Sequence, residues 1–230
     1  EHRADGVIIC STSFGEEQSR QFLQYGVPIV VVNNQAVEDF RYSIYHDDVD
    51  GSRQVTRHLI ELGHKRIAYI GNSASGRTTL DRLTGFQQEM ESAGLAVPAE
   101  YIYEASGSGA GNGLSVAEYF LSFPNRPTAL VCYNDMLAIG VLKGLQQAGM
   151  HVPGDISITG FDNIVFSAYT NPALTTLDQP KRFIGAEAAR LLLELLDTPA
   201  SQELSAQQNV RILKGQLLIR ASTAPPPISV

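Results

Sequence analysis

Apolar residues along this chain of 230 residues form short continuous runs, which alternate with longer stretches where apolar positions recur every three or four residues. The short runs are rich in β-branched residues and predict strands, and they lie at residues 7–10, 28–34, 42–46, 66–71, 101–104, 128–133 and 156–159. The longer stretches predict amphipathic helices at residues 14–25, 48–62, 82–93, 114–123, 136–148 and 183–196. Regular alternation of this kind predicts an α/β fold, with parallel sheets covered by helices on both faces.

The last part of the chain departs from this alternation. Residues 201–209 read as a polar linker and residues 211–220 as one final strand. The Pro-rich sequence ASTAPPPISV then predicts a tail without fixed structure.

Composition excludes several classes of protein. The net charge of −7 argues against a nucleic-acid-binding surface on this chain, since such surfaces carry a basic stripe. Cys10 and Cys132 lie inside apolar runs, which predicts buried free thiols rather than a disulfide and favours a reducing compartment. No apolar run has the length of about 18 residues that a membrane span needs. The first residues lack a starting Met and a signal-peptide pattern, so we expect a soluble, cytoplasmic chain that is truncated at its start.

Polar residues follow most of the predicted strands. Ligands of open α/β sheets bind outside the carboxyl ends of the strands, so these side chains are the first candidates for a binding site. They carry hydroxyls, amides and a few carboxylates, a set that suits a neutral polyhydroxylated ligand, and they are Ser11, Thr12, Asn33, Asn34, Asp47, Asn72, Ser73, Ser106, Ser108, Asn134, Asp135, Asp162 and Asn163.

Signals for an enzyme fail on inspection. The glycine cluster at residues 107–113 follows a strand but does not fit G-x-G-x-x-G, and HDDVDG at residues 46–51 lacks the glutamate that a calcium loop needs. The nucleophile elbow G-x-S-x-G is not found. His64, at a predicted helix end, is expected to have a structural role. We therefore expect no cofactor, no metal and no catalysis.

Several longer motifs carry a family resemblance. They are GHKRIAYIG at residues 63–71, DRLTGF at 81–86, PTALVCYNDMLAIGVLKGL at 127–145, VPGDISITGFDN at 152–163, PALTTLDQP at 172–180 and LLIRAST at 217–223. In this order and spacing they resemble the effector-binding core of LacI/GalR-type bacterial transcription regulators. The resemblance covers nearly the whole chain.

The resemblance implies a fold like that of type I periplasmic binding proteins, in which two Rossmann-like lobes are joined by three crossing strands and hold an effector between them. Arg82 resembles the arginine that pairs with effector hydroxyls, and Asp162 the carboxylate that accepts hydrogen bonds from them. Further ligand-binding positions implied by the resemblance are Asn134, Gln179, Asn33, Thr78 and Ser108. Of these, Thr78 is expected in a loop that approaches the ligand. Ser108 stands where several relatives carry an aromatic ring, a departure that leaves effector size and stacking open.

Each of these residues also has a purely structural interpretation. Asp162 can brace the turn that follows it, and Arg82 can form a surface salt bridge at a helix start. Asn134 and Asp135 can cap the helix that begins near Met136. The residues alone leave these alternatives open.

The resemblance also predicts the organisation of the protein. The N-terminal lobe is expected from residues 1–46 and 180–206 and to be incomplete at its N-terminus, and the C-terminal lobe from 47–179 and 207–224, with a tail at 225–230. A DNA-binding helix-turn-helix is not recognisable in this chain. The expected protein is the ligand-sensing part of a homodimeric repressor, which contacts operator DNA through a missing N-terminal domain. No contact with a membrane is expected. Its effector is a mono- or disaccharide, with a nucleoside or purine as the alternative. An extracytoplasmic solute-binding protein and a small-molecule enzyme are the rival classes.

Overall fold

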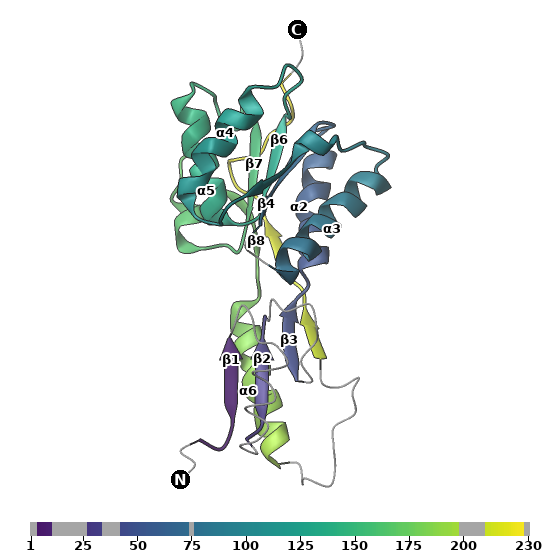
Figure 1. Cartoon of the computed structure of the whole chain (residues 1–230), viewed down its shortest axis with the longest axis vertical. Coiled ribbons are helices and arrows are strands. Elements are labelled where there is room, and N and C mark those ends of the chain that lie inside the picture. Colours follow the sequence, from purple (N-terminus) through teal and green to yellow (C-terminus); the bar gives the residue numbers. More distant parts are fainter. Residues whose placement is uncertain (1–3, 11–26, 34–41, 74–75, 198–209, 228–230) are drawn as a thin grey trace. The chain divides into compact units, whose positions relative to one another are not determined.

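The chain folds into two compact units, each built from segments that are distant in the sequence (Figure 1). A computed structural model describes residues 4–10, 27–33, 42–73, 76–197 and 210–227; the helix expected at 14–25 and the linker expected at 201–209 lie outside these residues. The first unit comprises Glu1–Asp47 and Pro180–Lys214, and the second comprises Asp48–Gln179 and Gly215–Val230. The backbone therefore passes from one unit to the other three times.

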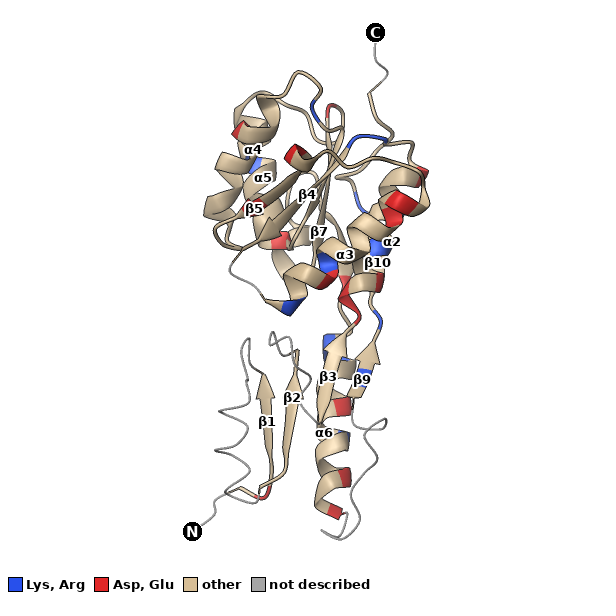
Figure 2. Cartoon of the chain, turned by 45° about the vertical axis from the view of Figure 1, so that its right-hand side comes forward, with Lys and Arg blue, Asp and Glu red and all other residues tan. Residues whose placement is uncertain are grey.

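The first unit contains a four-stranded parallel sheet. Its strands are β1 (Val7–Cys10), β2 (Ile29–Val32), β3 (Ser43–His46) and β9 (Val210–Leu213), and they lie in that order. Helix α6 (Lys181–Asp197) packs on this sheet through Ile184, Ala188 and Leu191. Strands β1 and β2 carry no charged side chain, as their uniform tan colour in Figure 2 shows. Burial of Val30, Val32 and Ile44 of β2 and β3 against α6 supplies a core of the unit.

The second unit is a doubly wound α/β domain with a six-stranded sheet in the order β10-β8-β7-β6-β4-β5, in which only β10 runs antiparallel to its neighbour. The strands are β4 (Ile67–Asn72), β5 (Ile102–Ala105), β6 (Ala129–Cys132), β7 (Ser157–Phe161), β8 (Thr175–Asp178) and β10 (Gln216–Leu218). The α-helices are α2 (Asp48–Glu61), α3 (Arg77–Ser92), α4 (Gly113–Leu121) and α5 (Asp135–Gln147), and short 3₁₀ helices span Ala99–Tyr101, Ala110–Asn112 and Val165–Ala168.

Side chains that alternate along the central strands fill two apolar layers. In β4, Ile67 and Tyr69 join the layer formed with α2 and α3, whereas Ala68 and Ile70 join the layer formed with α4 and α5. Figure 1 shows the two helix pairs on opposite sides of the sheet. A strand buried on both faces has no polar face, which explains why these strands appear in the sequence as continuous apolar runs.

The C-terminal part of the chain differs from the prediction of one strand at residues 211–220. Two short strands form there because β9 pairs in parallel with β3, whereas β10 pairs antiparallel with β8 in the other sheet. The boundary between the units consequently falls between Lys214 and Gly215, not at residue 207 as expected. Strand β8 was also missed, because its sequence TTLD is too polar to be distinguished by an apolar run.

The expected unstructured tail is anchored over its first residues. The buried Ser222 hydroxyl donates to the Ile158 carbonyl oxygen at 2.6 Å and accepts from the Thr175 amide at 2.8 Å. The ring of buried His64 lies 2.9 Å from both the Thr128 hydroxyl and the Ala224 carbonyl oxygen, so its role is structural, although its carbonyl partner is in the tail rather than at a helix end. We call residues 221–224 and these partners the C-terminal clasp.

Both cysteines are free thiols, but they differ in exposure. Cys132, in a central strand, is buried as predicted. Cys10 is exposed, contrary to the prediction, because β1 is an edge strand of its sheet.

Candidate functional site

The backbone after β7 turns sharply at two consecutive residues. Asp162 has φ 104° and Asn163 has φ 47°, both in the left-handed region that residues with a side chain rarely adopt. Hydrogen bonds hold this turn: the Asp162 amide donates to the Leu177 carbonyl oxygen at 2.9 Å, and the Asn163 side chain donates to Asp178 at 2.9 Å. The surrounding sheet therefore fixes the position of the Asp162 carboxylate just beyond the carboxyl end of β7.

Arg82 of α3 lies at the centre of this edge of the second unit. Its Nε donates to Asp48 Oδ1 at 2.8 Å, one terminal nitrogen donates to the Tyr133 carbonyl oxygen at 2.5 Å, and the other lies 3.4 Å from Asp162 Oδ1. The Arg82 side chain is only 5% exposed, so the interpretation as a surface salt bridge is wrong. Its position is set by α3, whose Gly85 packs against α2 so closely that a Cβ would meet the Val49 carbonyl oxygen at 2.3 Å.

Aromatic rings also contact this guanidinium. Its central carbon lies 3.7 Å from the centroid of the Phe161 ring and 4.7 Å from that of Tyr133, distances at which a cation is attracted to a ring face. Burial by itself lowers the pKa of Arg82, but the carboxylates of Asp48 and Asp162 outweigh burial and hold the pKa above its ordinary value. Arg82 therefore remains charged under all ordinary conditions.

Gln179, which directly follows the last residue of β8, completes the group. Its side-chain amide donates to Asp162 Oδ1 at 2.6 Å, so that one carboxylate oxygen interacts with both Gln179 and Arg82. Asp162 keeps 27% of its side chain exposed, whereas Asp48 keeps 12%. We call Arg82, Asp162, Gln179 and Asp48 the Arg82 cluster; it combines guanidinium and amide donors with carboxylate acceptors at one edge of the sheet.

Asp48 is the member that sequence reasoning missed as a site residue. It was considered only as a helix cap, and it is indeed the first residue of α2. A signal was available, since Asp48 follows shortly after the end of β3, where Asp47 had been counted among the polar residues that follow strands. Asp48 and Arg82 are 34 residues apart in the sequence, so no local pattern predicts their contact.

Two neighbours of the cluster have clear structural roles. Asn134 caps α5, because its side-chain oxygen accepts from the Leu137 amide at 2.9 Å. Asp135 is fully buried; its carboxylate accepts from the Ile164 amide at 2.8 Å and from the Thr176 hydroxyl at 2.5 Å. Asp135 thus fastens the start of α5 to the segment after β7.

The remaining predicted residues lie on three different segments of the chain. Thr78 is buried in the first turn of α3, not in a loop, and its spacing of four residues places it on the same helix face as Arg82. Ser108 is half-buried in a bend between β5 and the 3₁₀ helix at Ala110–Asn112. Asn33 belongs to the first unit and has φ 48°. Its side-chain oxygen accepts from the His46 amide at 3.1 Å.

A cavity of about 290 Å³ adjoins Asn33 within the first unit. It lies at the carboxyl ends of β1 and β2 and at the start of α6, and it is lined by Ile8, Cys10, Val32, Asn33, Lys181, Ile184, Gly185 and Ala188. Each unit therefore presents its polar candidates at the edge of the sheet where α/β proteins bind ligands.

In the described residues, no group of three or more His, Cys, Asp or Glu side chains could hold a metal ion. None of the helices in the described part of the chain combines the length and apolar character needed to cross a lipid bilayer.

A family model described as a periplasmic binding protein-like domain matches residues 56–223 of this chain. The chain belongs to the periplasmic binding protein-like domain family. Within this family it is similar to the HTH-type transcriptional repressor PurR of Aliivibrio salmonicida (strain LFI1238), with 34% identity over 195 residues, which are 84% of this chain and 58% of that protein. The chain thus spans less than two thirds of the length of that relative.

Solved structures of LacI family regulators agree with the fold. A LacI family transcriptional regulator from Mycobacterium smegmatis has a TM-score of 0.82 at 32% identity, over 98% of this chain and 81% of that one. A LacI family regulator from Enterococcus faecium with bound ribose has a TM-score of 0.83 at 28% identity, over 96% of this chain and 80% of that one. These matches confirm the resemblance to the effector-binding core of LacI/GalR regulators. They do not favour the solute-binding or enzyme alternatives, since these proteins are named as regulators.

Proposed function

We propose that this chain is the ligand-sensing part of a bacterial transcriptional repressor that acts in the cytoplasm. The Arg82 cluster is the observation that carries the proposal, because it gathers donors and acceptors at the ligand-binding edge of an α/β sheet. The similarity to PurR repressors and LacI family regulators supports the regulatory role. Operator DNA is bound in the whole protein by a helix-turn-helix domain, in line with the names of those relatives.

The chemistry of the cluster favours a small polyhydroxylated effector. Asp162 is partly exposed and accepts hydrogen bonds, Arg82 and the Gln179 amide donate them, and a sugar hydroxyl does both. The ring faces of Phe161 and Tyr133 are within contact of the Arg82 guanidinium, so they are less available for stacking on a flat base. We therefore propose a mono- or disaccharide, with a nucleoside or purine as the alternative. Asn134, Thr78 and Ser108 of the second unit are proposed to contribute further contacts, and Asn33 is proposed as a ligand-binding residue within the first unit.

Effector binding would change operator affinity by a population shift. A ligand that binds one arrangement of the protein more tightly than another shifts the equilibrium toward that arrangement. A coupling free energy of about 1–3 kcal/mol changes operator affinity by about 5- to 150-fold.

Thermal unfolding with a panel of sugars, sugar phosphates, nucleosides and purines tests the effector proposal. A ligand at about 100 times its dissociation constant stabilises the native state by about 2.7 kcal/mol, which appears as a raised melting temperature. We expect a sugar to raise the melting temperature of the wild type and of Asp155→Asn, whose carboxylate is exposed, but not of Asp162→Asn. A shift that survives in Asp162→Asn would contradict the assignment of the site. The same ligand must alter operator affinity of the full-length protein, or the regulatory role fails.

We also propose that the protein is a homodimer. Met136, Val165, Phe166 and Tyr169 are 38, 73, 68 and 81% exposed. The Asp135 carboxylate accepts from the Ile164 amide at 2.8 Å, so the chain positions next to Met136 and Val165 are held together on the second unit. An apolar patch of this kind marks a surface that is covered by a partner, and a second copy of the chain would cover it symmetrically.

Sedimentation velocity tests the homodimer. We expect the wild type to sediment as a dimer at micromolar concentration and Phe166→Glu as a monomer, because a buried unpaired charge opposes association. Leu80→Glu, which changes a large apolar side chain at 56% exposure on α3, is the control and should remain dimeric. A wild type that is monomeric at these concentrations would contradict the proposal.

A further inference from the structure

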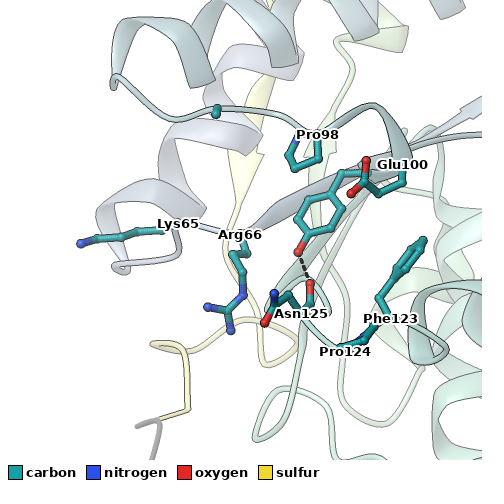
Figure 3. A pocket seen from close by; sticks show the side chains of 9 residues that line it. Lys65, Arg66, Pro98, Glu100, Phe123, Pro124 and Asn125 are labelled. Atoms are coloured by element: carbon teal, nitrogen blue, oxygen red, sulfur yellow. Dashed lines mark hydrogen bonds between the residues drawn. The ribbon is translucent and has the colours of Figure 1, made fainter.

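A second pocket lies in the second unit at the amino ends of β4, β5 and β6 (Figure 3). It has a volume of about 550 Å³, within the range of small-molecule sites. The connections before these three strands form it, and its lining residues are Lys65, Arg66, Ala96, Pro98, Glu100, Tyr101, Phe123, Pro124 and Asn125. The Arg82 cluster lies at the carboxyl ends of β7 and β8. The two sites therefore lie at opposite ends of the parallel strands of one sheet.

Cationic side chains mark one side of the pocket. Lys65 and Arg66 precede β4, and the Arg66 backbone is held because its carbonyl oxygen accepts from the Thr128 amide at 2.8 Å. The Arg66 Nε donates to the Arg126 carbonyl oxygen at 3.1 Å, and this bond restricts the orientation of the guanidinium. Two cations against the single lining carboxylate Glu100 make this a locally positive site on a chain with a net charge of −7. Such a site attracts anions from solution.

Rigid apolar groups form the wall of the pocket. Tyr101 is 5% exposed, and its hydroxyl donates to the Asn125 carbonyl oxygen, the contact drawn as a dashed line in Figure 3. Its ring centroid lies 6.4 Å from that of Phe123. Burial raises the pKa of Tyr101, although nearby Arg66 opposes this, so the hydroxyl stays protonated and keeps its bond. With Pro98 and Pro124, these rings offer flat, immobile surfaces that lose little entropy when a ligand binds.

Glu100 adds a second polar feature. Figure 3 shows its carboxylate and the Arg66 guanidinium on different sides of the pocket. A ligand that bridges them needs an anionic group for Arg66 and a hydrogen-bond donor for Glu100, with a flat body between the two.

We propose that this pocket binds a small aromatic carboxylate that carries a hydroxyl or amino group opposite the carboxylate. The carboxylate pairs with Arg66, the ring lies against Tyr101, Phe123 and the two prolines, and the donor reaches Glu100. This site is separate from the Arg82 cluster and independent of the effector proposed above.

Saturation-transfer NMR followed by calorimetric titration tests the site, with 4-hydroxybenzoate as the probe and 4-hydroxybenzyl alcohol as its neutral analogue. We expect 4-hydroxybenzoate to bind more tightly than the alcohol, and Arg66→Gln to weaken its binding about tenfold, since a charge-assisted bond is lost. Lys143→Gln removes an exposed positive charge on α5 of the same unit and should leave binding unchanged. Glu100→Gln should reduce the preference for 4-hydroxybenzoate over benzoate.

The outcomes that overturn the proposal are distinct from a failure of the effector site. Absence of saturation transfer in the wild type, equal affinity for the neutral alcohol, or undiminished binding to Arg66→Gln would each overturn it. Asp162→Asn, which is expected to abolish effector binding, should bind 4-hydroxybenzoate as the wild type does; loss in that variant would place the probe in the other site. Arg66 is exposed, so the variant should fold, and its melting temperature verifies this.

Discussion

At the scale of single residues, Arg82 is the most constrained side chain of the site. It is buried with two carboxylates, one carbonyl oxygen and two aromatic rings around it, and this full set of partners offsets the cost of removing a charge from water. The contact between Arg82 and Asp162 Oδ1 at 3.4 Å holds this carboxylate at the edge of the sheet, a positioning role that supports binding.

Arg82→Ala should destabilise the second unit strongly. It leaves the carboxylates of Asp48 and Asp162 without their cation in a largely buried place, and loss of one partner from a buried ion pair costs about 3–5 kcal/mol. Because Asp162 is partly exposed, the lower end is the better expectation. Urea unfolding at neutral pH measures this change. Arg190→Ala removes an arginine whose side chain is 63% exposed and should cost under about 1 kcal/mol; equal losses in the two variants would contradict the argument.

Sequence reasoning reached some of these residues and missed others for a physical reason. The motifs around Arg82, Asp162 and Gln179 fixed their places along the chain, and the structure brings the three together. Asp48 was missed because a carboxylate at a helix start already has a sufficient use as a cap. Thr78 was expected in a loop because α3 begins five residues earlier than its apolar pattern shows.

At the scale of elements, close contacts between backbones decide where glycine is required. Gly160 in β7 faces α5, and a Cβ there would meet Asp135 Oδ1 at 2.2 Å. The same carboxylate holds the Ile164 amide and the Thr176 hydroxyl, so it cannot move aside without losing both bonds.

Gly160→Ala should therefore destabilise the protein by about 1–3 kcal/mol, the usual cost of overpacking a rigid core. Gly109→Ala is the control, because no atom lies within 4 Å of a Cβ built there and its φ is outside the left-handed region. Thermal and urea unfolding of both variants would measure the difference. An unchanged stability in Gly160→Ala would mean that the Asp135 carboxylate is free to shift.

The elements were easier to predict than their pairing. Strands buried on both faces and helices with a clear apolar face follow from local patterns, and within the described residues the structure has them near the expected positions. The split between β9 and β10 could not be predicted from the pattern of residues 211–220, because it depends on the partner strand that each half meets. Pairing over long separations leaves no local signal.

At the scale of the whole molecule, the C-terminal clasp links the end of the chain to the helices and strands of the second unit. His64 contributes an uncharged ring to it, since burial lowers its pKa below the ordinary value, although the bond to the Ala224 carbonyl opposes this. His58, whose ring nitrogen lies 2.9 Å from the Thr223 hydroxyl, also has a pKa lowered by burial.

Stability should therefore fall in mild acid. The unfolded chain takes up protons at these histidines near the ordinary pKa of about 6.5, while the folded protein does so only at lower pH. The stabilisation is thus present above about pH 6.5 and decreases as pH falls toward the folded pKa values. Unfolding free energies measured by urea between about pH 5 and 8 should show a smaller slope in His64→Gln than in the wild type. His151→Gln, at an exposed position, is the control, and an identical slope in His64→Gln would contradict the role assigned to the clasp.

The pairing of β3 with β9 has a consequence for synthesis on the ribosome. β3 ends at His46 and β9 begins at Val210, so the nascent chain emerges with one side of β3 unpaired until Val210–Leu213 has been translated. The second unit, most of which is one continuous stretch, emerges in the meantime. The first unit is therefore completed only after most of the second unit has emerged, and its apolar strands are exposed to chaperones and to aggregation during that interval.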